Sequence, residues 1–153
     1  MEEKRLKVKS DALRLLAFRP RSVEELREKL EDKGHSAEDV AGVLEEFSKK
    51  GLLNDEKFGK LLVQSRLSQN PASKRTIALE LKKKGLSPKA QAAAMETLSD
   101  YDEKTAAREI ARRKVDGMTE LPRDKKKRRL YGFLKRRGFS DEVVFSVMGE
   151  LIQ

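Results

Sequence analysis

The sequence contains no cysteine and no tryptophan, and aromatic residues make up only 5% of its 153 residues. The absence of cysteine excludes disulfides and thiolate metal sites and is typical of proteins from a reducing compartment. Few aromatics favour thin helical modules over a thick sheet sandwich. No apolar run approaches the roughly 18 residues of a membrane span, and the first residues do not resemble a signal peptide. We therefore expect a soluble cytoplasmic protein that does not bind membranes.

Charged residues, by contrast, are abundant and unevenly placed. They make up 40% of the chain, and the formal net charge is +9. Residues 104–137 hold 14 Lys/Arg against 4 Asp/Glu, whereas residues 10–60 hold 10 basic and 12 acidic side chains. This asymmetry favours a polyanion or an acidic protein surface as the partner of the C-terminal half. The alternative is a solvated face that only keeps the protein soluble.

One pattern occurs three times along the chain. Its glycines, Gly34, Gly85 and Gly138, are 51 and 53 residues apart. In each copy apolar residues precede the glycine by eight and four positions, a serine follows by two, and apolar residues follow by 10 and 13. A fixed period of this length indicates tandem supersecondary units, which present a long surface rather than one closed pocket. The apolar and serine positions are Leu26, Leu30, Ser36, Leu44 and Phe47; Ile77, Leu81, Ser87, Met95 and Leu98; and Leu130, Leu134, Ser140, Met148 and Leu151.

Helix start and stop signals predict an all-α fold of three tandem three-helix repeats, about nine helices in all. The repeats span 10–53, 54–99 and 100–153, and the first helix runs from 10 to 18. Modules of this size are marginally stable alone, so neighbours should share an apolar junction in an elongated array, either straight or curved. The expected helix starts are the Ser22–Glu25 capping box, Ser36, Asp55, Ser73, Ser87-Pro88, Asp102, Arg123 and Ser140.

Most aromatic residues are predicted to be structural. Phe139 should pack back on the helix before Gly138, and Tyr131 should pack at the rim of the core, with base stacking as the alternative. His35 is expected to be an ordinary surface residue. No nucleophile–base pair, metal-ligand cluster or phosphate-binding glycine loop is evident, so we expect neither an enzyme nor a cofactor or metal. The predicted core aromatics are Phe18, Phe47, Phe58, Phe133 and Phe145.

Clusters of cations are the candidate binding residues. The run 125–129 lies near a predicted helix start, where cations are disfavoured, so local helix electrostatics do not explain it. Helical spacing directs Leu130, Phe133, Leu134 and Arg137 toward the core or its rim. The strongest candidates are Lys125, Arg128, Arg129, Lys135 and Arg136. Further candidates are Lys126, Lys127, Arg112, Arg113, Lys114, Lys82, Lys83 and Lys84, and the weakest are Arg66, Lys74 and Arg75.

Several segments together resemble the RecX family over residues 10–152. They are Ser22-Val-Glu-Glu-Leu26, Gly51-Leu-Leu-Asn-Asp55, Lys84-Gly85-Leu86 and Phe133-Leu-Lys-Arg-Arg-Gly-Phe-Ser140. The loop Ser68–Ser73 departs from the family pattern, which commonly has glycine there. The resemblance implies a regulator of the RecA recombinase that lies along RecA–DNA filaments and suppresses strand exchange, ATP hydrolysis and the coprotease role in the SOS response.

The resemblance also implies binding to DNA, foremost single-stranded and then double-stranded, by a protein that we expect to be a monomer. Two alternatives remain from the residues alone. Three-helix units could belong to a helix-turn-helix transcriptional regulator, although no single helix shows an outward set of Arg, Asn and Gln for base reading. A general basic RNA-binding or chromatin-like protein would bind nucleic acid equally well with or without recombinase.

Overall fold

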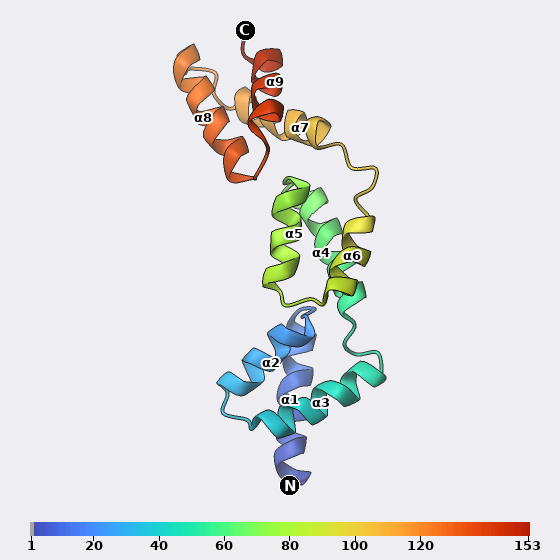
Figure 1. Cartoon of the computed structure of the whole chain (residues 1–153). Helices are drawn as coiled ribbons and strands as arrows, with labels where there is room; N and C mark the ends of the chain where they lie inside the picture. The colour runs from blue at the N-terminus through green and yellow to red at the C-terminus, as the bar shows by residue number, and fades with distance from the viewer. Residues whose placement is uncertain (1) are drawn as a thin grey trace. The chain divides into compact units, whose positions relative to one another are not determined.

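The computed structural model describes residues 2–153, and within them the chain forms nine α-helices and no strand (Figure 1). The predicted all-α class and the number of helices are confirmed. In this part of the chain no helix is long and apolar enough to cross a membrane. The helices are α1 (Glu2–Phe18), α2 (Val23–Asp32), α3 (Ala37–Lys49), α4 (Asp55–Gln69), α5 (Lys74–Lys83), α6 (Pro88–Glu96), α7 (Glu103–Asp116), α8 (Arg123–Arg136) and α9 (Asp141–Leu151).

Side-chain caps start most of these helices where the sequence predicts them. At α2 the Ser22 Oγ accepts from the backbone N–H of Glu25, and the Glu25 carboxylate accepts from the N–H of Ser22, both at 3.1 Å. This reciprocal pair satisfies two backbone donors that a helix start otherwise leaves open. Ser36, Asp102 and Ser140 cap α3, α7 and α9 in the simpler way.

One predicted helix start and one predicted capping residue are wrong. Helix α1 begins at Glu2 rather than Ser10, because Val8 adds a fully buried position one turn before Ala12 and extends the packed face. The dense charge around Val8 hides this position in the sequence. At α4 the cap is Asn54, whose Oδ1 accepts from the N–H of Lys57 at 3.1 Å, and Asp55 instead bonds to a different helix.

The chain packs as two compact units, and each has its own features. Unit 1 runs up to Leu62 and includes Glu80–Glu96. Helices α1, α2 and α3 pack pairwise in it around one apolar cluster. The buried members of that cluster are Val8, Ala12, Leu26, Leu30, Val40, Val43, Leu44, Phe47 and Leu53.

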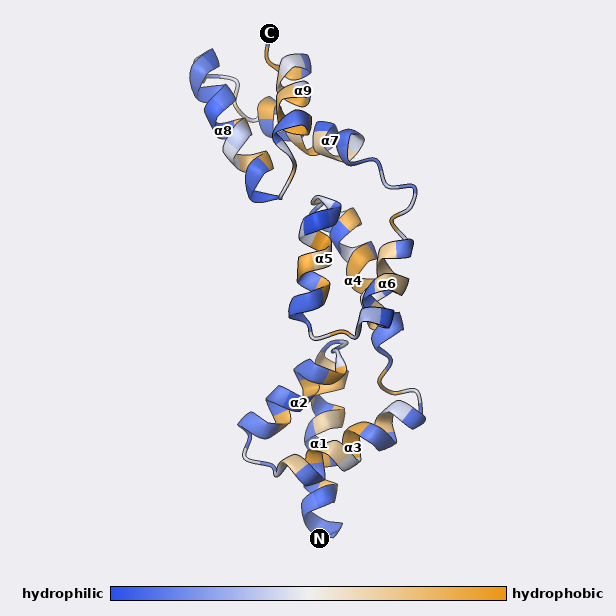
Figure 2. Cartoon of the chain, in the orientation of Figure 1, coloured by the Kyte–Doolittle hydropathy of each residue, from blue (hydrophilic) through white to orange (hydrophobic). Residues whose placement is uncertain are grey.

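Unit 2 consists of Val63–Leu79 and Thr97–Gln153. Its main core lies between α7, α8 and α9, and the ribbon of the N-terminal half of α8 has the colour of hydrophilic residues (Figure 2). The predicted burial of Phe139 after Gly138 is confirmed, with the side chain 0% exposed. The other buried members are Ala107, Ile110, Ala111, Met118, Leu130, Leu134, Val144, Val147, Met148 and Ile152.

Two of the predicted core aromatics are instead exposed. Phe18 is 82% and Phe145 58% accessible, whereas Phe47 and Phe58 are buried as predicted. Successive helix residues point about 100° apart, so Phe145 falls beside the stripe that Val144 begins rather than on it. Phe18, six residues after Ala12, is about 120° away from it around α1.

A hydrogen-bonded junction joins the start of α2 to the end of α5 within unit 1. The Ser22 Oγ donates to the carbonyl of Lys84 at 2.6 Å, and the N–H of Val23, the first residue of α2, donates to Asp55 Oδ1 at 2.9 Å. Gly85 has φ +76°, and a Cβ placed on it would lie 2.6 Å from the Cβ of Glu24. The contact therefore requires glycine, both for its backbone angle and for its lack of a side chain.

The same arrangement recurs within unit 2 between the start of α5 and the end of α8. The N–H of Ser73 donates to the carbonyl of Arg137 at 3.1 Å, and the N–H of Lys74 donates to Glu103 Oε1 at 2.6 Å. Gly138 has φ +87°, and a Cβ there would lie 1.8 Å from Thr76 Oγ1. The apolar pattern used to predict shared junctions contains no sign of these hydrogen bonds.

The third copy of the pattern differs at the corresponding position. Pro122 stands at the N-cap of α8, where Ser22 and Ser73 precede α2 and α5, and it makes no side-chain capping bond. Proline has neither a hydroxyl nor a backbone N–H, so it offers no donor to a neighbouring carbonyl.

Candidate nucleic-acid interface

Helix α8 carries the strongest predicted cations, and its buried side is fixed by Leu130 and Leu134, both 0% exposed. Because the same side of a helix returns every three or four residues, burial of these leucines turns the intervening residues outward. Lys126 and Lys127 are half-buried. The outward cations in the exposed class are Lys125, Arg128, Arg129 and Arg136.

The cations of the run 125–129 are not neutralised by carboxylates of the described part of the chain. Among the described residues none of its five cations forms an ion pair, although unit 2 does pair other cations. Arg108 and Lys104 share Glu150, at 2.6 and 3.4 Å. Five adjacent unpaired cations repel one another, so an anion that binds them relieves that repulsion as well as adding attraction.

Lys135, the remaining strong candidate, differs from its neighbours. Its Nζ lies 3.0 Å from Asp141 Oδ1, and Tyr131 donates to the same oxygen at 2.9 Å. These two hydrogen bonds, Lys135 first, lower the pKa of Asp141. Lys135 therefore already has a partner within unit 2.

The C-terminal part of α7 adds the exposed cations Arg112, Arg113 and Lys114. Lys114 Nζ lies 5.2 Å from the centre of the Phe133 ring, and the Arg137 guanidinium carbon lies 4.5 Å from it. A cleft of 310 Å³ includes these three side chains and Arg113. This basic, aromatic cleft is a feature that spacing alone did not predict, since Arg137 and Phe133 were assigned to the core or its rim.

Arg137 sits in an environment that disfavours its charge. Burial lowers the pKa of its guanidinium, and the nearby cations Arg66 and Arg136 lower it further. Its Nη1 donates to the carbonyl of Pro71 at 3.4 Å, and it forms no ion pair among the described residues. A partly buried arginine that is surrounded by other arginines would be stabilised by a bound anion.

The weaker candidates of unit 2 surround the loop that departs from the family pattern. Arg66 donates to the carbonyl of Asn70 at 2.7 Å, while Arg75 is exposed and Lys74 half-buried. Tyr101 donates to the carbonyl of Ala72 at 2.9 Å. The loop is thus held by hydrogen bonds from two sides without the glycine expected there.

Of the three cations before Gly85 in unit 1, Lys82 and Lys83 are exposed and form no ion pair with any residue from 2 to 153. Lys84 Nζ lies 2.9 Å from Glu25 Oε2, and Arg19 reaches the same oxygen at 2.9 Å. Burial alone would raise the pKa of Glu25, but the hydrogen bonds from Arg19, Lys84 and the Ser22 N–H outweigh it and lower that pKa to about 2. Lys84 therefore stabilises the first junction.

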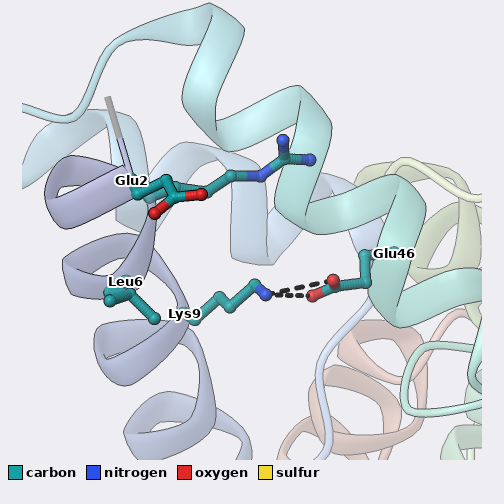
Figure 3. A pocket seen from close by; sticks show the side chains of 5 residues that line it. Glu2, Leu6, Lys9 and Glu46 are labelled. Carbon is teal, nitrogen blue, oxygen red and sulfur yellow. Dashed lines mark hydrogen bonds and ion pairs between the residues drawn. The ribbon is translucent and has the colours of Figure 1, made fainter.

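A hollow of 440 Å³ lies in unit 1 between α1 and α3. Figure 3 shows Lys9 reaching across it to Glu46, with the Nζ 3.0 and 2.9 Å from the two carboxylate oxygens. This ion pair, with the hydrogen bond from Lys9 first, lowers the pKa of Glu46. The pair braces the two helices and presents no nucleophile or base to a substrate.

The single histidine is not the ordinary surface residue that the sequence indicated. The side chain of His35 is 17% exposed, and its Nε2 lies 2.7 Å from Asp11 Oδ2. That contact lowers the pKa of Asp11. Within residues 2–153 no group of three or more metal-ligating side chains gathers at one place.

Family models match all three groups of helices. The first, second and third three-helix domains of RecX match residues 9–47, 54–95 and 100–148. The crystal structure of RecX from Lactobacillus salivarius has a TM-score of 0.76 at 18% identity and covers 99% of this chain and 98% of that one. A second structure, of a regulatory protein RecX, has a TM-score of 0.75 at 18% identity over 95% of this chain. The fold is therefore an array of RecX-type three-helix domains.

Proteins of similar sequence show the family as well as the fold. Regulatory protein RecX of Pelodictyon phaeoclathratiforme is 36% identical over 141 residues, which span 92% of this chain and 86% of that protein. Regulatory protein RecX of Amycolatopsis mediterranei is 33% identical over 149 residues, or 97% of this chain and 85% of that protein. The chain belongs to the RecX family of regulatory proteins.

Proposed function

We propose that this protein binds RecA–DNA filaments and inhibits their recombinase, ATPase and coprotease activities, and so modulates homologous recombination, DNA repair and the SOS response. The observation that carries the proposal is the unpaired cation run 125–129 on α8, in a chain that belongs to the RecX family. No enzymatic step is proposed for the chain, because binding alone would regulate the filament. The proposed setting is the cytoplasm, and the proposed state is a monomer.

Filaments of protein on DNA offer both phosphates and acidic side chains along their length. Arginine engages either anion with two parallel hydrogen bonds, whereas lysine acts as a point charge. Lys125, Arg128, Arg129 and Arg136 are exposed and unpaired, so they are proposed as the main contacts. Several weak contacts spread over a filament gain affinity through multivalency, without a deep pocket.

The remaining candidates have graded roles. The α7 cations Arg112, Arg113 and Lys114 extend the proposed surface within unit 2, and Lys82 and Lys83 offer a separate contact on unit 1. Lys84, Lys135 and Arg66 already have partners in the structure, so they are proposed as supports for neighbouring elements. Lys126, Lys127, Lys74 and Arg75 are proposed as secondary phosphate contacts.

The test compares two triple charge reversals. The first changes Lys125→Glu, Arg128→Glu and Arg129→Glu, and the matched control changes the exposed unit 1 residues Lys4→Glu, Lys7→Glu and Lys33→Glu. Both alter net charge by the same amount. Co-sedimentation with RecA–single-stranded DNA filaments and inhibition of filament ATPase are measured for each, with circular dichroism to verify helicity.

We expect the first variant to lose filament binding and inhibition with unchanged helicity, while the control keeps both. Affinity for DNA alone should fall steeply with salt, because counterions released from the phosphates favour binding. Equal binding of nucleic acid with or without recombinase would contradict the proposal and favour the general nucleic-acid-binding alternative. Full inhibition by the first variant would refute the role of the run.

A further inference from the structure

A hollow on unit 2 places an exposed aromatic ring beside unpaired cations. It has a volume of 380 Å³ and lies between the start of α8 and the end of α9, with Arg123, Lys127 and Phe145 among its lining residues. Phe145 is 58% exposed, an unusual exposure for so large an apolar side chain. The core residues Met148 and Ile152 form part of its lining, and the predicted strong contacts at 128, 129 and 136 do not.

The Phe145 ring is paired with a second aromatic ring. The Tyr131 and Phe145 ring centres are 5.6 Å apart with planes inclined by 32°, a favourable aromatic pair. The Tyr131 hydroxyl is in turn fixed to Asp141 at 2.9 Å. Gly149 lies one turn beyond Phe145 on α9, and a Cβ placed there would meet nothing within 4 Å, so the part of the hollow at Gly149 is open.

The cations at this hollow have no internal partner. Neither Arg123 nor Lys127 forms an ion pair within residues 2–153. Glu150, the nearest carboxylate in sequence to Gly149, is instead bonded to Arg108 and Lys104. An aromatic platform with unpaired cations at its edge fits an unpaired base with its phosphates, because every base presents a π-face for stacking while its phosphates need positive charge.

We propose that this hollow is a stacking site for an unpaired base of single-stranded DNA, with the base on Phe145 and the adjacent phosphates at Arg123 and Lys127. This proposal rests on the proposed filament-binding function and adds the ligand chemistry of one site. Duplex DNA would not enter the site, because its bases are already stacked and paired. The cation run 125–129 begins two residues after Arg123 and would continue the contact along the backbone.

The test uses the full chain and a fluorescein-labelled oligothymidylate without recombinase. Phe145→Leu removes the ring, and Phe145→Trp keeps a stacking surface. Phe18→Leu is the matched control, since Phe18 is also an exposed aromatic, at 82%, but lies in unit 1. Fluorescence anisotropy gives affinities for the oligothymidylate, for an abasic oligomer of the same length and for a duplex. Thermal melting verifies the folding of each variant.

Phe145→Leu should weaken binding to the oligothymidylate by about 5- to 150-fold, the range of one stacked base. It should leave affinity for the abasic oligomer and the duplex within twofold, and Phe18→Leu should change nothing. The chain has no tryptophan, so Phe145→Trp adds a single reporter whose fluorescence should be quenched by the oligothymidylate. Unchanged oligothymidylate affinity of Phe145→Leu, or an unquenched Phe145→Trp, would overturn the stacking site.

Filament co-sedimentation and ATPase inhibition by the same variants separate this proposal from the broader function. If the wild-type protein inhibits filaments but Phe145→Leu binds the oligothymidylate normally, the stacking site fails and the function stands. If Phe145→Leu loses filament binding while its affinity for DNA is unchanged, the ring contacts the recombinase, and the stacking proposal is also overturned. If Phe145→Leu loses oligothymidylate binding while the wild-type protein has no effect on filaments, the stacking site is supported and the proposed function is rejected.

Discussion

Replacing Gly138 with alanine tests the junction between the start of α5 and the end of α8. A Cβ at this position would lie 1.8 Å from Thr76 Oγ1, 2.6 Å from Ser73 Oγ and 3.1 Å from Thr76 Cβ. Because such separations are far below van der Waals contact, α5 or α8 must shift. That shift would stretch the hydrogen bond from the Ser73 N–H to the Arg137 carbonyl, now 3.1 Å.

Gly34 provides a matched control for the backbone. Its φ of +95° resembles the +87° of Gly138, but a Cβ at Gly34 would meet nothing within 4 Å. Alanine at either position therefore incurs the left-handed strain, about 1–2 kcal/mol. Only Gly138→Ala adds overpacking, about 1–3 kcal/mol, and a weakened hydrogen bond. We expect Gly138→Ala to lose about 2 kcal/mol more unfolding free energy than Gly34→Ala.

Urea denaturation followed by circular dichroism measures both variants against the parent protein. If the chain unfolds in more than one transition, the comparison applies to the transition that Gly138→Ala moves. Equal destabilisation by the two substitutions would show that φ alone requires glycine at 138. The close approach of Gly138 to Thr76 would then impose no steric requirement of its own.

Two further predictions concern titrating groups, one at the first junction and one beside the loop before α5. Glu25→Gln should lower the unfolding free energy by about 2 kcal/mol at neutral pH after allowance for solvent screening. Because the folded pKa of Glu25, about 2, lies below its usual 4.5, this difference should shrink in acid denaturation curves as pH falls from 4.5 toward 2; a difference that stays constant would contradict the role of its hydrogen bonds. Tyr101→Phe removes the hydrogen bond to Ala72 and should cost about 1 kcal/mol at pH 8. Burial, with a smaller effect of Glu103, raises the pKa of Tyr101 to about 12. The difference in unfolding free energy between the parent protein and Tyr101→Phe, measured by urea titration, should therefore diminish as pH rises from 10 to 12. A constant difference would contradict the burial of the hydroxyl.

The helices were predictable because their signals are local. A serine three residues before a glutamate, as at Ser22 and Glu25, specifies a helix start without reference to the rest of the fold. The repeat period located the glycine helix ends, and periodicity located most of the core. The start of α1 was missed because one buried residue, Val8, lies among charged neighbours.

The candidate surfaces were less predictable, because they depend on which neighbours a side chain meets. The exposure of Lys125 and Arg128 follows from helical spacing, but the ion pairs of Lys84 and Lys135 join residues from different elements. The exposure of Phe145 depends on how α9 is rotated about its own axis, because that rotation decides which of its residues face α8. Helical spacing defines a stripe only to within one residue, and that one residue decides whether the ring is core or surface.

The proline at the N-cap of α8 affects how a further three-helix module could be joined to the third one. Ser22 and Ser73 each donate a hydrogen bond to the module that follows, and Pro122 has no hydrogen to donate. A duplicated copy of the middle module, inserted between the second and third modules, would carry its own copy of Ser73 and could form the same hydrogen bond to the module after it. A copy appended behind the third module would meet at Pro122 a helix start that lacks this donor, so its junction would have one hydrogen bond fewer than the two junctions described above.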